Sequence, residues 1–340
     1  MRTVPIFFLA LAARTIAAEV DSSILERIVE STVNLRTHSI FPPYVDQDLQ
    51  NRWFSFGADA YVNTNKHIRL TRDVPSQTGW LWSRLPITVQ NFQVEVEFKI
   101  SGNHPNIHGD GMAIWLTRRR AEPGPVFGFE DKFEGLGLFI DTSVSWLSKL
   151  GTDELSPTLF HRFPNERHSY SFPRVMAMIG DGKTPYDQAR DGEPTSAGAC
   201  SANMRGQDIA TKIRITYIKG HFLDVKVHYR GWDQWEHCFT LEDPKLPNAP
   251  FLGLSALTGE VSDAHDIIAV TTSTLLLNHE KAGVTPLQQP QARQKGVFSK
   301  LWSLFTRLAL LALVVAGGFA GWKAYLKRTG GAMPWDGKRF

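Results

Sequence analysis

Three runs of sequence decide the fold: HGDGMAIW at residues 108–115, GPVFG at residues 124–128 and GLGLFID at residues 135–141. The first and third runs contain apolar stretches typical of strands, with Asp110 just before one and Asp141 at the end of the other. Glycine adopts backbone angles that other residues avoid and lets a ligand come close to the main chain. Both carboxylates are therefore expected at loop bases on neighbouring strand ends, which is the arrangement that a calcium-assisted sugar site needs.

Much of the chain between residues 37 and 280 alternates apolar and polar residues with the period of a strand. In residues 93–100, four apolar residues alternate with three charged residues and one glutamine, which predicts a half-buried strand. Glycine, proline and asparagine punctuate such segments, and long helical periodicity is missing. Many short strands with glycine-rich turns predict an all-β sandwich or barrel. Further strands are expected at residues 174–179, 213–218, 222–229, 251–257 and 267–277.

The two ends of the chain have the character of membrane-targeting segments. Residues 1–18 begin with Arg2, continue with an apolar run and end in small residues, as secretory signal peptides do. Residues 301–322 carry no charge apart from Arg307, and a membrane-spanning helix needs about 20 residues. The tail that follows is mainly basic, which favours a cytosolic location. We therefore expect a single-pass, type I membrane protein with a lumenal main domain.

These boundaries divide the chain into six expected parts. They are a signal peptide at 1–18, an N-terminal lead-in at 19–36, a lumenal domain at 37–280, a polar stalk at 281–300, a transmembrane helix at 301–322 and a cytosolic tail at 323–340.

Composition excludes one class of partner and indicates a compartment. The formal net charge is only +3, and the basic residues are scattered, so nucleic acid is not an expected partner. The chain has two cysteines, Cys200 and Cys238, which the signal peptide would send to an oxidising compartment. An even count suits one disulfide, and two reduced core cysteines are the alternative.

The runs around Asp110 and Asp141 resemble the L-type lectin domain of cargo receptors of the early secretory pathway. The resemblance is to the short-stalked vesicular integral membrane lectin type and its fungal relatives, and it covers roughly residues 37–280. It implies a concanavalin-like jelly-roll sandwich of two antiparallel sheets and a disulfide between Cys200 and Cys238. It also implies location in the membranes of the endoplasmic reticulum, the ER–Golgi intermediate compartment and the Golgi apparatus.

The resemblance further implies a calcium site, since calcium takes six to eight oxygen ligands. The expected ligands are Asp141, the backbone carbonyl of Phe163, Asn165 and Asp191. In the family the first three lie close together in sequence, whereas here residues 143–162 separate them. This segment is either translated intron sequence in the gene model or a lineage-specific loop that covers the sugar site.

A sugar site is implied beside the calcium, with Asp110 accepting hydrogen bonds from mannose hydroxyls. The chain departs from the family pattern at two of its positions. Gln188 stands where the family has a histidine and cannot titrate, so histidine-driven release at low pH is not expected. Glu260 is longer than the family aspartate and is expected to crowd the pocket. The complete expected set is Ser76, Asp110, Asn165, Gln188, Gly259, Glu260 and Val261.

The function that this resemblance implies is that of a calcium-dependent lectin. It would bind high-mannose N-glycans on glycoprotein cargo for ER–Golgi transport or quality control, with vesicle coat machinery as a partner of the cytosolic tail. One alternative is a glycosidase that uses Glu95 and Glu97, but Gln93 and Lys99 continue the same strand face, which indicates a solvated surface. We expect no enzymatic activity. The other alternative is a protein-binding receptor or scaffold on the same fold, with a degenerate sugar site.

Overall fold

The computed structural model describes residues 29–104, 108–142 and 173–278, together with Lys323. The expected signal peptide, stalk and transmembrane helix lie outside the described residues, and so does the segment 143–162. Among the residues described, no helix is long and apolar enough to cross a membrane.

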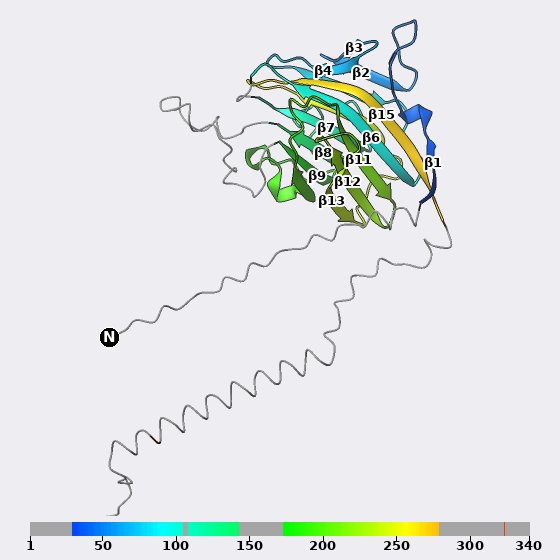
Figure 1. Ribbon diagram of the computed structural model, residues 1–340, viewed down its shortest axis with the longest axis vertical. Helices are drawn as coiled ribbons and strands as arrows, with labels where there is room; N and C mark the ends of the chain where they lie inside the picture. The colour runs from blue at the N-terminus through cyan, green and yellow to red at the C-terminus, as the bar shows by residue number, and fades with distance from the viewer. Residues whose placement is uncertain (1–28, 105–107, 143–172, 279–322, 324–340) are drawn as a thin grey trace, which may run out of the picture. The chain divides into compact units, whose positions relative to one another are not determined.

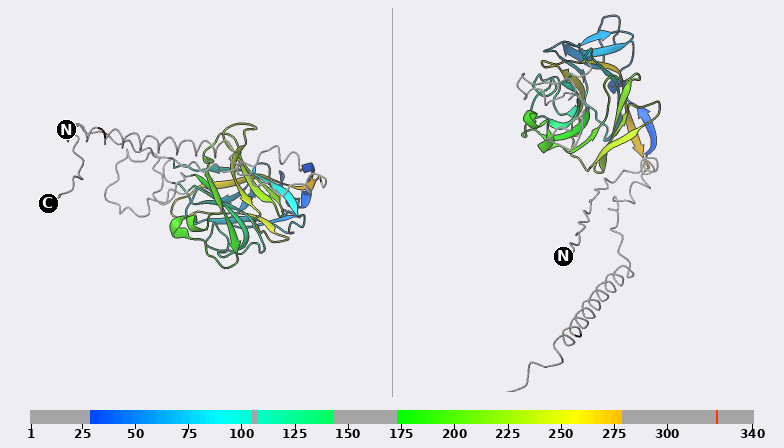
Figure 2. Two further views of the ribbon diagram at one scale, coloured as in Figure 1. Left: turned by 90° about the horizontal axis from the view of Figure 1, so that it is seen from below. Right: turned by 60° about the vertical axis from the view of Figure 1, so that its left-hand side comes forward.

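The strands of the described residues form two antiparallel sheets that pack face to face (Figures 1 and 2). One sheet has eight strands in the order β13-β12-β11-β6-β15-β4-β3, with β1 also paired to β15. These strands are β1 (Val29–Asn34), β3 (Tyr61–Asn63), β4 (His67–Thr71), β6 (Asn91–Ser101), β11 (Thr211–Ile218), β12 (Phe222–His228), β13 (Glu236–Glu242) and β15 (Ala264–Leu277).

The other sheet has seven strands in the order β10-β9-β8-β7-β14-β5-β2. They are β2 (Phe54–Ala58), β5 (Thr78–Ser83), β7 (Gly111–Thr117), β8 (Glu134–Asp141), β9 (Arg174–Asp181), β10 (Gly198–Ser201) and β14 (Phe251–Leu257). The predicted all-β sandwich of two antiparallel sheets is therefore confirmed, and each strand expected from the sequence coincides with an observed one.

β6 shows how the sequence pattern produces the sandwich. Along this strand every second residue is buried, and Val94, Val96 and Phe98 belong to the core between the two sheets. Fully burying such a side chain contributes about 1.5–3 kcal/mol. The intervening side chains, Glu95 and Glu97 among them, lie on the outer face, where Arg214 and Lys212 form ion pairs with them. The two glutamates are thus half-buried and ion-paired on the outer face of this sheet, as the sequence pattern indicated.

The continuous apolar character of β7 and β8 has a different cause, because both faces of these strands are covered. Ile114 and Leu138 point into the core between the sheets. Trp115 and Phe139 point to the opposite face of the sheet, where they belong to a second, largely aromatic cluster. In this cluster the ring centroids of Trp115 and Phe129 are 4.8 Å apart. A strand that is buried on both faces does not alternate apolar and polar residues.

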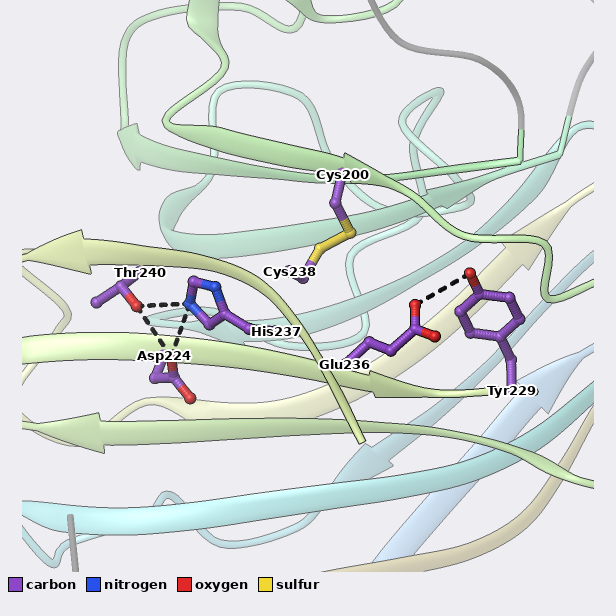
Figure 3. The surroundings of a disulfide bond; sticks show 7 residues. All are labelled: Cys200, Asp224, Tyr229, Glu236, His237, Cys238 and Thr240. Atoms are coloured by element: carbon purple, nitrogen blue, oxygen red, sulfur yellow. Dashed lines mark hydrogen bonds and ion pairs between the residues drawn. A yellow bond between two sulfur atoms is a disulfide. The ribbon is translucent and has the colours of Figure 1, made fainter. Parts of the chain in front are cut away.

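The disulfide between Cys200 and Cys238 is present, as the family resemblance implied (Figure 3). It joins β10 to β13, which are the edge strands of the two sheets, with a Cα–Cα distance of 5.3 Å. The bond closes a loop of sequence separation 38, which the chain-entropy model values at about 4 kcal/mol.

β1 lies in the segment 19–36 that was expected to be a lead-in. It pairs with β15, so the sandwich begins at least as early as residue 29. Five of its six residues are exposed, which is why the sequence carries no burial pattern that would reveal a strand there.

One end of the sandwich gathers loops from both sheets. In the seven-stranded sheet, Gly111 at the start of β7 lies opposite Asp141 at the end of β8. In the eight-stranded sheet, Asp263 immediately precedes β15. The hydroxyl of Thr142 donates a hydrogen bond of 3.3 Å to the Asp263 carboxylate, so the loops of the two sheets meet at this end.

Candidate carbohydrate-binding site

An open pocket of about 260 Å³ lies at this end of the sandwich. Four of the residues that line it were expected from the sequence to bind sugar or calcium, namely Asp110, Asp141, Gln188 and Asp191. The remaining lining residues are Pro125, Val126, Phe127, Tyr186 and Leu257. The structure thus brings together residues that are up to 147 positions apart in sequence, from Asp110 to Leu257.

Asp110 is held at the pocket by backbone hydrogen bonds. Its carbonyl accepts a hydrogen bond of 3.1 Å from the Thr142 amide, and its carboxylate accepts one from the amide of Gly259. Burial raises the pKa of Asp110 to about 6, although the Gly259 hydrogen bond opposes the shift. A Cβ atom at position 259 would lie 3.0 Å from Oδ2 of Asp110, which explains why glycine is suited to this position.

The loop that contains Ser76 packs directly against Gly259. The Ser76 amide donates a 3.0 Å hydrogen bond to the Gly259 carbonyl, and Ser76 itself has a left-handed φ of 58°. The neighbouring Thr258 hydroxyl accepts from the Gln77 amide at 2.9 Å. Ser76 thus contacts Gly259, whose backbone lies beside the Asp110 carboxylate, although neither Ser76 nor Gly259 is among the residues that line the described pocket. Glu260 is exposed and Val261 is half-buried, and neither is among the residues that line the described pocket.

Asp141 and Asp191 add two further carboxylates to the lining of the pocket. Asp141 is nearly buried at the end of β8, with 8% of its surface exposed. Asp191 follows the short 3-10 helix η4 (Gln188–Arg190), and its left-handed φ of 50° turns the chain back. Burial and then the charges of Asp141 and Asp191 raise the pKa of Tyr186, so the tyrosine stays neutral beside them.

Two carboxylates that face one pocket are the hard oxygen donors that calcium prefers, so the residues present fit this ion. The other two expected ligands, Phe163 and Asn165, lie outside the described residues. Within the part of the chain that is described, no group of three or more histidine, cysteine, aspartate or glutamate side chains could hold a metal ion.

Gln188 lines the pocket, whereas His108 lies outside its lining, two residues before Asp110. The exposed Gln188 side chain donates a 3.1 Å hydrogen bond to the Pro125 carbonyl, which ties η4 to the loop 124–128. His108 Nδ1 lies 2.7 Å from the Thr142 carbonyl. Burial, followed by the nearby Arg205 charge, lowers the pKa of His108, so this ring is neutral at pH 7.

The apolar part of the pocket wall was not expected from the sequence. Phe127 is fixed there by stacking on Phe139, with ring centroids 5.1 Å apart. Its carbonyl also accepts a 2.6 Å hydrogen bond from the buried Ser255 hydroxyl. The glycines that flank residues 124–128 were the only local signal of a functional loop. Tyr186 and Leu257 reach the pocket through tertiary packing, for which the sequence gives no local sign.

A two-sheet sandwich with carboxylates gathered in a loop pocket is compatible with a lectin domain. The model of the legume-like lectin family matches residues 31–149 and 156–282, and the chain belongs to this family. The match is interrupted at residues 150–155, which fall inside the segment 143–162.

Individual relatives agree with this membership. The L-type lectin-like domain-containing protein C126.08c of Schizosaccharomyces pombe is 32% identical over 320 residues, which cover 91% of this chain and 93% of that protein. The VIP36-like protein of Mus musculus is 38% identical over 240 residues, which cover 69% of this chain but only 62% of that protein.

Solved structures agree as well. The lumenal domain of VIP36 in its Ca2+/Man3GlcNAc-bound form matches with a TM-score of 0.61 and 31% identity, over 72% of this chain and 93% of that domain. The carbohydrate recognition domain of Emp47p matches with a TM-score of 0.55 and 17% identity, over 72% of this chain and 97% of that domain, which shows the shared fold alone.

Proposed function

We propose that this protein is a calcium-dependent lectin that binds high-mannose N-glycans on glycoprotein cargo. The observation that carries the proposal is the position of Asp110. Its carboxylate lies beside Gly259 in the wall of a pocket that Asp141 and Asp191 also line. The relatedness to VIP36, whose lumenal domain has been solved with calcium and mannose oligosaccharides, supports the same assignment.

The chemistry follows from the groups at the pocket. Ionised Asp110 has acceptor oxygens for adjacent sugar hydroxyls, and the Gly259 amide fixes the carboxylate so that it need not reorganise on binding. Phe127 gives the pocket an apolar wall for the ring carbons of a sugar. Asp141 and Asp191, with Phe163 and Asn165 as further expected ligands, would hold calcium. The ion would supply a fixed positive charge that orders oxygen ligands near the sugar.

We propose the same topology and location that the sequence predicts. A signal peptide at 1–18 would send the domain into the secretory pathway, and an anchor at 301–322 would hold it in the membranes of the endoplasmic reticulum, the ER–Golgi intermediate compartment and the Golgi apparatus. The polar segment 281–300 would serve as a stalk, and the tail 323–340 would face the vesicle coat machinery. The relatives named vesicular integral-membrane protein VIP36 support this proposal.

Glycan binding is tested by passing the full-length protein over immobilised mannose in calcium and then in EDTA. We expect retention in calcium and release in EDTA, with a weak affinity, of order millimolar to tens of micromolar, for a single site of few contacts. Asp110→Ala should abolish retention, whereas Glu260→Asp should preserve it, because Glu260 is exposed and lies off the described pocket. Blank glycan arrays in millimolar calcium would contradict the proposal.

A second candidate function keeps the fold and loses the sugar. Gln188 in place of the family histidine favours it, because this side chain is engaged with the Pro125 carbonyl. The protein would then be a protein-binding receptor or scaffold. Unchanged capture of deglycosylated cargo, together with failure to bind mannose, would favour this second candidate.

A further inference from the structure

A buried ion pair between Arg205 and Asp263 lies next to Thr142, the residue that follows Asp141 of the pocket. Arg205 donates three hydrogen bonds to the Asp263 carboxylate, from Nε to both oxygens at 3.0 Å and from Nη2 to Oδ1 at 2.8 Å. The Asp263 side chain is fully buried, and that of Arg205 is 12% exposed. Removing two charges from water carries a desolvation penalty that their attraction often fails to exceed, so a buried pair is weak evidence of a stabilising role. The role of the pair is therefore better inferred from the residues that it contacts than from the electrostatic attraction between its two charges.

Thr142 connects this pair to both acidic loops of the site. Its hydroxyl donates to Asp263 at 3.3 Å, and its amide donates to the Asp110 carbonyl at 3.1 Å. Its carbonyl lies 2.7 Å from Nδ1 of His108. Thr142 is completely buried and directly follows Asp141. A shift of Thr142 would thus move the Asp110 loop and the Asp141 carboxylate together.

The same ion pair also contacts the loops on either side. Arg205 Nη2 donates a 2.8 Å hydrogen bond to the His104 carbonyl, in the segment that leads to Asp110. The Asp263 carbonyl accepts a 3.0 Å hydrogen bond from the Thr71 hydroxyl, and Asp263 lies four residues after Gly259. The pair therefore touches the segments that present Asp110, Asp141 and Gly259.

We propose that Arg205 and Asp263 are positioning residues for ligand binding, which act through Thr142 to hold the calcium-binding and sugar-binding carboxylates in one arrangement. This inference rests on the proposed lectin function. Binding sites lose affinity steeply when their supporting groups allow small displacements, so loss of the pair weakens both calcium and mannose binding without any change in the residues that touch either ligand.

The chain offers a matched control in a second ion pair of the same kind. Arg69 on β4 donates to Asp266 on β15 with bidentate distances of 2.6 and 2.7 Å. Asp266 is 6% exposed and lies only three residues from Asp263. Neither Asp263 nor Asp266 lines the described pocket, but Asp263 accepts a hydrogen bond from Thr142, whereas Asp266 pairs with Arg69 on β4. A general loss of stability would therefore appear in both variants, whereas a loss of positioning would appear only at Asp263.

The test uses the full-length protein, with urea unfolding to select conditions in which each variant is folded. Calcium alone and then mannose are titrated calorimetrically into wild type, Asp263→Asn and Asp266→Asn. We expect Asp263→Asn to weaken calcium binding at least 10-fold and mannose binding by a similar factor. Asp266→Asn should stay within 2-fold of wild type for both ligands.

Two milder variants keep the test decisive if Asp263→Asn does not fold. Thr142→Val preserves the ion pair and the volume and removes only the hydroxyl that reaches Asp263, and it should weaken calcium binding 3- to 10-fold. Arg205→Lys retains the charge and should bind more tightly than Arg205→Ala. Unchanged binding by folded Asp263→Asn or Thr142→Val, or an equal loss in Asp266→Asn, would overturn the inference alone. Absence of calcium and mannose binding by wild type would overturn the lectin function and this inference with it.

Discussion

Replacing Asp110 by asparagine should stabilise the calcium-free protein while abolishing its proposed function. Burial raises the pKa of Asp110 to about 6 in the folded state, from an ordinary value of 3.8 in the unfolded chain. Between these two pH values Asp110 keeps its proton in the folded state and loses it in the unfolded state. The contribution of this proton to the free energy of unfolding is therefore fully present below about pH 4 and is lost as the pH rises through 6. A difference of about 2 pKa units corresponds to about 3 kcal/mol, which is the upper bound of the loss.

The asparagine variant escapes this loss because its amide is neutral at every pH. Its side-chain oxygen can still accept the Gly259 hydrogen bond, so the native contact is retained. We expect urea unfolding in EDTA to give equal stabilities for wild type and Asp110→Asn at pH 4, with the variant gaining up to about 3 kcal/mol by pH 7.5. A pH-independent difference between the two proteins would refute the reasoning.

Asp73 provides a control because its pKa is shifted in the opposite direction to that of Asp110. Burial alone would raise its pKa, but hydrogen bonds from the Asn103 amide and the Ser262 hydroxyl hold the pKa of Asp73 below its usual value. A lowered pKa contributes stability that is present at neutral pH and is lost as the pH falls through the folded-state pKa. Asp73→Asn should therefore destabilise the protein at pH 7.5 and become neutral in acid.

Three further predictions concern other parts of the molecule. Replacing Cys200 and Cys238 by serine should reduce the free energy of unfolding by about 4 kcal/mol, measured by urea titration, and an unchanged midpoint would contradict the value assigned to the disulfide. Gly259→Ala should weaken mannose binding at least 10-fold in calorimetry, because its Cβ would lie 3.0 Å from Oδ2 of Asp110; wild-type affinity would mean that the loop yields freely. Excising residues 143–162 should tighten calcium binding severalfold, whereas weaker binding would mean that the segment belongs to the site, and sequencing the mature transcript would show whether the segment is expressed.

The sequence predicts the sandwich well because most strands carry a local burial signal. β6 alternates over its whole length, and β7 and β8 are apolar runs flanked by glycines. β1 carries no such signal, since it is held almost entirely by backbone pairing to β15. Backbone hydrogen bonds leave no trace in residue type, so an exposed strand of this kind cannot be predicted from its sequence.

The candidate site likewise contains residues that could be predicted from the sequence and residues that could not. Asp110, Asp141 and Asp191 could be identified from the family motifs, and they do line one pocket. The residues proposed to position these carboxylates could not be predicted from the sequence, because Thr142 and Asp263 are 121 residues apart and Arg205 and Asp263 are 58 apart. Only the meeting of the two sheets brings these side chains into contact. The roles of Phe163 and Asn165 stay predictions.

The most direct measurement of the central claim is a calorimetric titration of mannose into the full-length protein, repeated in calcium and in EDTA from pH 7.5 to pH 5. Mannose should bind only in calcium, and its affinity should fall in acid. That loss follows Asp110, which must be ionised to accept sugar hydroxyls. Burial raises its pKa to about 6 without calcium, and a bound cation would lower this pKa, so the loss is expected at the acid end of the range. Gln188→His should add a second, histidine-driven step to this profile. Equal mannose affinity in calcium and in EDTA, or none in either, would contradict the claim that this pocket is a calcium-dependent sugar site.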